Sequence, residues 1–277
     1  MTNILDGRKV SIELKEILKE QIKNLNLKLV VISVGDDEAS KIYIKNKEKS
    51  CSLVNIKFLH ISYTDNVLES EIISKIEELN NDDSITSILV QLPINKKYNS
   101  KKIIDTIIPS KDVDGLTTTN IGLFNNNRGG IIPCTAKGIL SLLRYYNISV
   151  ESKNICIVGK SNLVGKPIGT LLLNEGATVT VCHSKTKDLF KHTKNADIII
   201  CAVGKANLIN KNMIKKDCVV IDVGINRIDN RIVGDVNFDE VSSLTSFISP
   251  VPGGVGPMTI VSLLENVYEC YKVGKKL

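Results

Sequence analysis

A regular alternation of apolar runs with amphipathic stretches is the feature that most limits the folds open to this chain. In the first half, three runs rich in valine, isoleucine and leucine alternate with three stretches of helical period, over 8–25, 29–34, 39–53, 56–62, 68–79 and 85–92. Such an alternation places consecutive strands parallel, with the helices crossing over between them. The pattern therefore predicts a parallel sheet covered by helices.

A segment of different composition follows. Residues 109–134 are rich in Asp, Gly, Thr and Asn, which predicts an irregular segment at an active site or between domains. A second series is then predicted, with helices over 135–146 and 258–271 and strands over 154–158, 178–182, 197–202 and 218–223. Because 277 residues suffice for two cores of this kind, we expect two α/β domains.

Composition narrows the function classes. The net charge of +6 is spread along the chain rather than gathered in one basic run with aromatic residues, which argues against nucleic-acid binding and suits a small polyanionic ligand. The seven cysteines are too widely spaced for a zinc or redox motif. Four lie in or beside apolar strand-like runs, where buried thiols are expected: Cys156, Cys182, Cys201 and Cys218. No signal peptide or membrane-length apolar run is recognisable, which predicts a cytoplasmic protein without membrane contact.

A glycine-bearing turn in the second half is a candidate phosphate site. The strand predicted over 154–158 runs into Gly159-Lys160-Ser161 and then Gly165-Lys166-Pro167. A turn between strand and helix presents backbone N–H groups to a phosphate at the helix N-terminus. The run is not a P-loop, because Pro167 occupies the place of the hydroxyl ligand of magnesium, and it lacks the usual Gly-x-Gly-x-x-Gly spacing. An ordinary tight turn is the alternative.

The end of the next strand favours one cofactor. His183-Ser184-Lys185-Thr186 stands where a dinucleotide-binding fold contacts the adenosine ribose. An acidic residue is usual there in NAD enzymes, whereas Ser184, Lys185 and the nearby Lys160 suit the 2′-phosphate of NADP. Gly204 and Gly224 close two later strands at the edge where cofactors bind, although both could be plain turn glycines, and His183 could be a simple strand-end residue.

Four polar residues of the first half are candidates for substrate chemistry. Tyr43 and Lys47 share one helix face, Gln91 ends a strand, and Asp114 follows on a loop. Each has a structural alternative: a half-buried ring, a solvated lysine or a turn-capping carboxylate. The histidines show no metal-ligand spacing, and no Ser or Cys has a recognisable nucleophile setting, so neither a metal nor a covalent intermediate is predicted.

Taken together, the motifs resemble one family over nearly the whole chain, the bifunctional methylenetetrahydrofolate dehydrogenase / methenyltetrahydrofolate cyclohydrolases. The resemblance rests on these runs in family order: Glu38-Ala39-Ser40, Tyr43, Lys47, Gln91-Leu92-Pro93, Lys111-Asp112-Val113-Asp114-Gly115, Pro133-Cys134-Thr135, Gly159 to Pro167, His183 to Thr186, and Pro250 to Thr259. The last run is the most specific. Asn95 and Ala136 replace prolines that are usual in the family, which bears on loop stiffness rather than on the chemistry.

The resemblance implies a fold and an activity. Residues 1–138, with 260–277 packing back onto them, would form a folate-binding catalytic domain with a parallel sheet. Residues 139–259 would form a Rossmann-like NADP domain. The protein would oxidise 5,10-methylenetetrahydrofolate with NADP and hydrolyse the product to 10-formyltetrahydrofolate, in one-carbon metabolism. Its partners would be tetrahydrofolate derivatives, with or without a polyglutamate tail, and a second copy in a homodimer.

Residue roles follow from the same resemblance. Tyr43 would stack on the folate, Lys47 would act in catalysis, Gln91 would hold Lys47, and Asp114 would bind the pterin. The substrate site would comprise Ser40, Tyr43, Leu92, Asp114, Pro252 and Gly253. The cofactor site would comprise Gly159, Lys160, Ser161, Gly165, Pro167, Ser184, Gly204 and Ile225.

The two reactions differ in what they need from Lys47. Hydride removal needs mainly a cofactor held in line, whereas hydrolysis of the methenyl cation needs a base for the attacking water. A cationic substrate and a partly dry cleft would disfavour the charged form of Lys47 and make it that base, although it could instead only orient the water. Other NADP oxidoreductases, such as shikimate- or amino-acid-type dehydrogenases, and a non-catalytic nucleotide sensor are the alternatives.

Overall fold

The computed structural model describes residues 2–229 and 231–276, which divide into two compact units. We call Glu13–Cys134, with the C-terminal stretch from Ile260, the three-strand unit. The chain up to Ile12, with Thr135–Thr259, is the six-strand unit. The division falls inside two helices, α1 (Gly7–Ile22) and α10 (Val255–Lys275).

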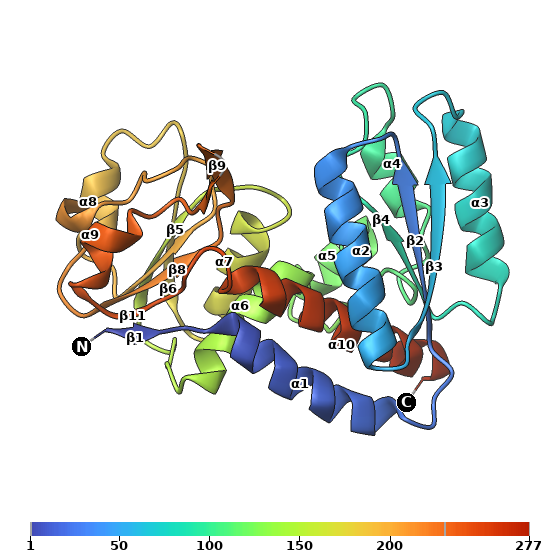
Figure 1. The fold of residues 1–277 in the computed structure, drawn as a ribbon, viewed down its shortest axis with the longest axis horizontal. Coiled ribbons are helices and arrows are strands. Elements are labelled where there is room, and N and C mark those ends of the chain that lie inside the picture. The colour runs from blue at the N-terminus through green and yellow to red at the C-terminus, as the bar shows by residue number, and fades with distance from the viewer. Residues whose placement is uncertain (1, 230, 277) are drawn as a thin grey trace. The chain divides into compact units, whose positions relative to one another are not determined.

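The three-strand unit has the strand–helix alternation predicted from the sequence. Its remaining elements are β2 (Lys28–Val34), α2 (Glu38–Leu53), β3 (Lys57–Tyr63), α3 (Glu69–Asn81), β4 (Ser87–Val90), α4 (Ser100–Asp105) and α5 (Thr118–Asn125). The strands are parallel in the order β3-β2-β4, and α2 and α3 flank them in Figure 1. Because β2 has a neighbour on each side, the strand order reverses there, and ligands bind beyond the carboxyl end of such a strand.

Both faces of this small sheet are buried, and alternate residues of β2 supply the two faces. Leu29 and Val31 belong to a cluster that includes residues of α1, α2 and α10, whereas Val30 and Ile32 pack with α3 and α4. A strand covered on both faces has a continuous apolar sequence. The run over 29–34 is therefore explained by two separate cores.

The C-terminal helix packs on this unit, as predicted. Leu263, Leu264 and Val267 of α10 lie in the cluster that contains Leu29 and Val31. The return of the last helix to the first domain is thus confirmed.

The six-strand unit is a parallel sheet in the order β1-β11-β8-β7-β5-β6. Its remaining elements are β1 (Asn3–Ile4), α6 (Cys134–Tyr145), β5 (Asn154–Val158), α7 (Gly165–Asn174), β6 (Thr178–Cys182), α8 (Leu189–Thr193), β7 (Ile198–Cys201), η1 (Lys211–Met213), β8 (Cys218–Asp222), β9 (Asn226–Ile228), β10 (Arg231–Val233), α9 (Phe238–Ser242) and β11 (Thr245–Ile248). The strand order reverses between β5 and β7. That is where a doubly wound sheet binds its ligand.

The structure corrects three expectations. The segment 109–134, predicted to be irregular, contains α5, and β9, β10 and β11 were not predicted. The first residues belong to the six-strand unit rather than to the first domain, because β1 pairs with β11. A strand as short as β1 has too few residues for a recognisable pattern. Asn95 caps its own turn by accepting a hydrogen bond from the Lys97 N–H at 3.1 Å.

The carboxylate of Asp197 joins two other segments of the six-strand unit. It accepts hydrogen bonds from the Asn154 N–H at 2.7 Å and from the Lys215 ammonium, and these contacts, Lys215 first, hold the pKa of Asp197 below its usual value. Because the carboxylate is only partly exposed, we expect Asp197→Asn to lower the free energy of unfolding by about 1 kcal/mol at neutral pH.

The effect should depend on pH in a defined direction. A group whose pKa is depressed by folding stabilises the protein above its unfolded value, about 3.9, and the contribution is lost as the pH falls through the folded value. Denaturant titrations of wild type and Asp197→Asn should therefore converge in acid. The exposed Glu240→Gln serves as the control, and an Asp197 effect that persists unchanged in acid would contradict the assignment.

Candidate active site

The amine of Lys47 is held at the carboxyl end of β4. Lys47 lies in the middle of α2, is half-buried, and donates a hydrogen bond to Gln91 Oε1 at 2.8 Å. The amide of Gln91 is oriented in turn, because its Nε2 donates to the Leu92 carbonyl at 2.6 Å. The contact expected between Lys47 and Gln91 is therefore present, and Lys47 is not merely a solvated helix lysine.

Asp114 joins this pair from the loop between α4 and α5. Burial raises the pKa of Asp114, and the nearby charge of Lys47 opposes that rise. The Cys134 thiol also lies 3.3 Å from Asp114 Oδ1. Three of the four predicted catalytic residues thus lie close to one another, and a carboxylate with an elevated pKa beside a lysine is typical of a functional site.

A network of buried polar groups shapes the Asp114 loop. Asp112, immediately before it, is buried and accepts hydrogen bonds from the Thr117 N–H at 2.8 Å and from Asn120 Nδ2 at 2.9 Å. From α10, Asn266 Nδ2 donates to the carbonyls of Val113 at 3.0 Å and Ile132 at 2.8 Å. Asn266 could not be singled out from sequence, because its partners lie more than a hundred residues away.

Tyr43 lies one turn before Lys47 on α2 and is 40% exposed. At that exposure more than half of the side chain is covered, which also agrees with the structural alternative of a half-buried ring. It offers an aromatic face to a flat ligand near the Lys47 amine. Stacking of this kind remains a prediction.

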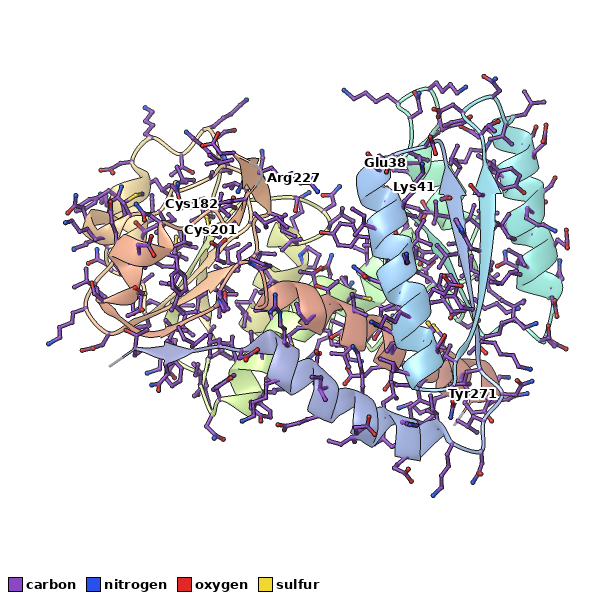
Figure 2. The ribbon with its side chains drawn as sticks, in the orientation of Figure 1. Glu38, Lys41, Cys182, Cys201, Arg227 and Tyr271 are labelled. Atoms are coloured by element: carbon purple, nitrogen blue, oxygen red, sulfur yellow. The ribbon has the colours of Figure 1, made fainter. Side chains whose placement is uncertain are left out.

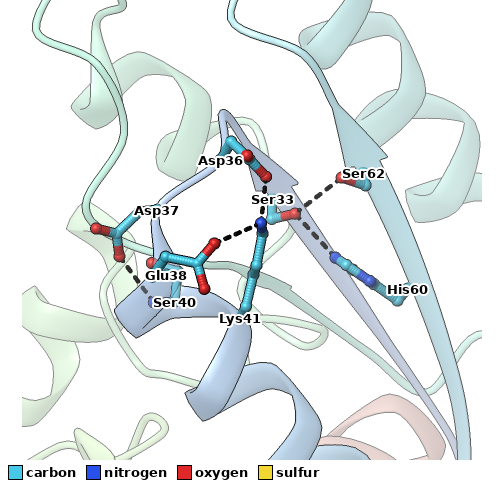
Figure 3. A network of polar contacts seen from close by, with 8 residues as sticks. All are labelled: Ser33, Asp36, Asp37, Glu38, Ser40, Lys41, His60 and Ser62. Atoms are coloured by element: carbon cyan, nitrogen blue, oxygen red, sulfur yellow. Dashed lines mark hydrogen bonds and ion pairs between the residues drawn. The ribbon is translucent and has the colours of Figure 1, made fainter.

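A small cavity of about 110 Å³, with mostly polar residues around it, borders Gln91 at the carboxyl ends of β2 and β3. Figure 3 shows its polar contacts: Ser33 Oγ lies 2.8 Å from His60 Nε2, and Lys41 pairs with Asp36 at 2.6 Å and Glu38 at 2.8 Å. Ser40 lines the cavity and donates its N–H to Asp37 at 2.7 Å. Its buried hydroxyl has no hydrogen-bond partner within the described residues. A buried hydroxyl of this kind usually bonds to a ligand or to water.

In the six-strand unit, the turn after β5 has the shape of a phosphate site. Gly159 has a φ of +126°, and a Cβ there would lie 2.3 Å from the Ala202 carbonyl oxygen. Only glycine fits such a close approach between the ends of β5 and β7. Ser161 Oγ accepts hydrogen bonds from the N–H groups of Val164 at 3.1 Å and Gly165 at 3.4 Å, so it caps α7. Pro167 is buried in the first turn of α7, so it stabilises the start of this helix from the protein interior.

The remaining cofactor candidates line the same edge of the sheet. Lys160, Ser184 and Lys185 are exposed, so a hydroxyl and two ammonium groups are available to a 2′-phosphate. His183 accepts a hydrogen bond from the Lys185 N–H through Nδ1 at 3.2 Å, which supports its alternative interpretation as a strand-end residue. Gly204 is exposed beyond β7, and Ile225, which follows β8, is 51% exposed and presents apolar surface. These features fit a dinucleotide, which has a flat ring at each end and phosphate groups between them.

Pro252 and Gly253 lie in the six-strand unit, not in the unit that holds Lys47. The Gly253 carbonyl accepts a hydrogen bond from the Arg8 N–H at 3.1 Å. Their part in substrate binding remains a prediction.

The cysteines are structural. All seven are buried, including Cys182 and Cys201 of the six-strand unit (Figure 2). Burial raises the pKa of Cys51 and of Cys218 to about 12, so neither thiol ionises readily.

Across residues 2–229 and 231–276, no group of His, Cys, Asp and Glu has a metal-binding arrangement. No helix in the described part of the chain is both long and apolar enough to cross a bilayer.

A doubly wound sheet with a glycine turn at its switch point, joined to a second α/β unit with a lysine-centred polar site, defines a two-domain nucleotide-dependent enzyme. Sequence models of two domains match the chain: the tetrahydrofolate dehydrogenase/cyclohydrolase catalytic domain over residues 5–114, and its NAD(P)-binding domain over 133–275. The chain therefore belongs to the tetrahydrofolate dehydrogenase/cyclohydrolase family.

Individual relatives agree. The bifunctional protein FolD of Agathobacter rectalis is 48% identical, over 98% of this chain and 100% of its own. The crystal structure of the bifunctional FolD of Campylobacter jejuni superposes with a TM-score of 0.96 at 46% identity and covers both chains completely. The FolD of Trypanosoma brucei, complexed with NADP cofactor and inhibitor, gives 0.94 at 31% identity, over 100% of this chain and 99% of its own. Shikimate 5-dehydrogenase of Thermus thermophilus shares only the fold, at 9% identity and a TM-score of 0.56.

Proposed function

We propose that this enzyme oxidises 5,10-methylenetetrahydrofolate to 5,10-methenyltetrahydrofolate with NADP and then hydrolyses the product to 10-formyltetrahydrofolate. The observation that carries the proposal is the hydrogen bond between Lys47 and Gln91 beside Asp114. A dinucleotide cofactor needs only the six-strand unit. The separate lysine-centred site accounts for the second, hydrolytic activity.

In the oxidation, the bound cofactor would accept the hydride, and residues of the chain hold the substrate in position. Tyr43 offers its exposed ring as a stacking surface for the folate. Asp114 accepts hydrogen bonds from the amino edge of the pterin, which fixes the substrate in the plane of the ring. Neither role requires a proton to move.

In the hydrolysis, the attacking water must lose a proton to the protein. Lys47 is the candidate group, because its amine is fixed by the 2.8 Å hydrogen bond to Gln91 Oε1 beside the methenyl carbon's proposed site. The adjacent cavity, with the unpartnered Ser40 hydroxyl, is large enough to hold water. Lys47 thus serves the second step more than the first.

One assay on purified wild-type protein tests the proposal. With 5,10-methylenetetrahydrofolate, we expect NADPH to form from NADP, NADH to form much more slowly from NAD, and the methenyl intermediate to be consumed. Turnover of shikimate or an amino acid instead would support the alternative dehydrogenases. Cofactor binding without any turnover would support a sensor, and an outright preference for NAD would contradict the cofactor assignment.

Changing Ser184 to aspartate tests the 2′-phosphate site directly. The new carboxylate would face the 2′-phosphate of NADP, so we expect the KM for NADP to rise at least ~10-fold while the KM for NAD changes little. Steady-state kinetics with both cofactors measure the ratio. Ser243→Asp places the same charge on an exposed position of the same unit and should leave both values unchanged. An equal loss with both cofactors would place the 2′-phosphate elsewhere.

Three further properties belong to the proposal. We infer a homodimer joined at β6, which is an edge strand with Val181 41% exposed and the apolar Leu173 of α7 61% exposed. Light scattering that gives only the 30.4 kDa of one chain would contradict it.

A folate polyglutamate tail is accommodated by the exposed Lys45 and Lys49 of α2. The free thiols of Cys51, Cys156, Cys182, Cys201 and Cys218 favour the reducing cytoplasm.

A further inference from the structure

One buried carboxylate joins the loops that follow β7 and β8. Asp235 is fully buried and accepts hydrogen bonds from three successive backbone N–H groups after β7, those of Val203 at 2.7 Å, Gly204 at 3.1 Å and Lys205 at 2.8 Å. It also accepts a hydrogen bond from the side chain of Asn226, just beyond β8, at 2.9 Å. A single side chain therefore sets the conformation of one loop and fixes its distance from the other.

The backbone of Asp235 is itself held by a second carboxylate, that of Asp222. Asp222, at the end of β8, accepts hydrogen bonds from the N–H groups of Asp235 and Val236, both at 2.9 Å. Close packing completes the arrangement, because a Cβ on Gly224 would lie 2.0 Å from the carboxyl carbon of Asp235. Glycine at 224 is therefore a condition for the Asp235 carboxylate to occupy this place.

The contacts of Asp235 also determine what the loop can offer a ligand. Successive N–H groups after a strand can form an anion site, but these three already bind a carboxylate. The outward surface of the loops is instead apolar, with Val203 39% and Ile225 51% exposed. We therefore expect a phosphate to bind at the Gly159 turn and a flat ring to bind beside the loops that follow β7 and β8.

We propose that Asp235 is a positioning residue for the dinucleotide, which holds Gly204 and Ile225 in the arrangement that receives one of the two ring-bearing ends of the cofactor. Asp235 acts through the two loops and does not touch the cofactor. The inference rests on the proposed assignment of these loops to NADP. It predicts a separation of the two activities, because the hydrolytic residues Lys47, Gln91 and Asp114 belong to the three-strand unit.

Asp235→Asn is the test. The amide keeps the size of the side chain but replaces one acceptor oxygen with a donor that faces N–H groups, so the loops must move apart. We expect the Kd for NADP and its KM in the dehydrogenase assay to rise about tenfold or more, with cyclohydrolase activity within about twofold of wild type. Calorimetry, both assays and thermal melting on the full-length protein provide the measurements.

Asp239→Asn, an exposed acid of the same unit, is the matched control and should behave as wild type. If Asp235→Asn is insoluble, Asn226→Ala removes one donor alone and should raise the Kd for NADP about threefold. An equal loss of both activities, or unchanged NADP binding in a folded variant, would overturn the proposal. If wild type binds no NADP at all, it is the proposed function that fails.

Discussion

Lys47→Met is expected to abolish cyclohydrolase activity while sparing part of the dehydrogenase activity. Methionine keeps the length and apolar stem of lysine but can neither accept a proton nor bond to Gln91 Oε1, which Lys47 contacts at 2.8 Å. Because a positioned base contributes about 10²–10⁴-fold, the rate of methenyltetrahydrofolate hydrolysis should fall at least ~100-fold. The dehydrogenase needs no proton transfer and should lose only what depends on substrate alignment. Separate assays from methylene- and methenyltetrahydrofolate measure the two effects.

A neighbouring lysine provides the control. Lys45 is exposed on the same helix, so Lys45→Met makes the same chemical change away from Gln91. With monoglutamyl substrates, which lack the tail assigned to Lys45, it should leave both rates unchanged. Equal retention of both activities in Lys47→Met would show that Lys47 is neither the base nor an essential orienter of water. A moderate cyclohydrolase loss with an unchanged pH profile would favour orientation over proton transfer.

The architecture was largely predictable because burial on both faces leaves a strong trace in the sequence. The runs over 29–32 and 155–158 are continuously apolar, and both belong to strands with a neighbour on each side, β2 and β5. Edge elements such as β1 and β10 lack that trace, since few of their residues are buried. The helix α5 was missed because its segment is rich in residues typical of turns. Its start depends on a Thr117 cap and on a hydrogen bond from the Thr117 N–H to the buried Asp112 carboxylate.

The residues of the candidate site likewise differ in how far they could be predicted from the sequence. Gln91 could be singled out because it ends a strand, and Lys47 because it lies one helical turn from Tyr43. Asp235 and Asn266 could not, because their importance lies in contacts between segments distant in the chain. Gly-Asp after a short hairpin is too common a pattern to indicate that the carboxylate binds three backbone N–H groups.

The turn after β5 permits the opposite separation of the two activities. Gly159→Ala would place a methyl group 2.3 Å from the Ala202 carbonyl oxygen, in a residue whose φ is +126°. The overlap and the backbone strain together should cost roughly 2–4 kcal/mol of stability. The ends of β5 and β7 must also separate, which displaces the cofactor. Because a misplacement of about 1 Å can cost 10²-fold in rate, we expect dehydrogenase activity to fall at least ~100-fold.

Gly176→Ala distinguishes loss of the cofactor site from loss of stability. Gly176 also has a positive φ, +83°, but its Cβ would meet only the Glu151 side chain at 3.4 Å, an ordinary contact distance. This variant should lose about 1–2 kcal/mol of stability and keep its affinity for NADP. Cyclohydrolase activity should survive in both variants, because Lys47, Gln91 and Asp114 lie in the other unit. If Gly159→Ala instead binds NADP normally, the glycine serves only the folding of the sheet, and the phosphate site must lie elsewhere along its carboxyl edge.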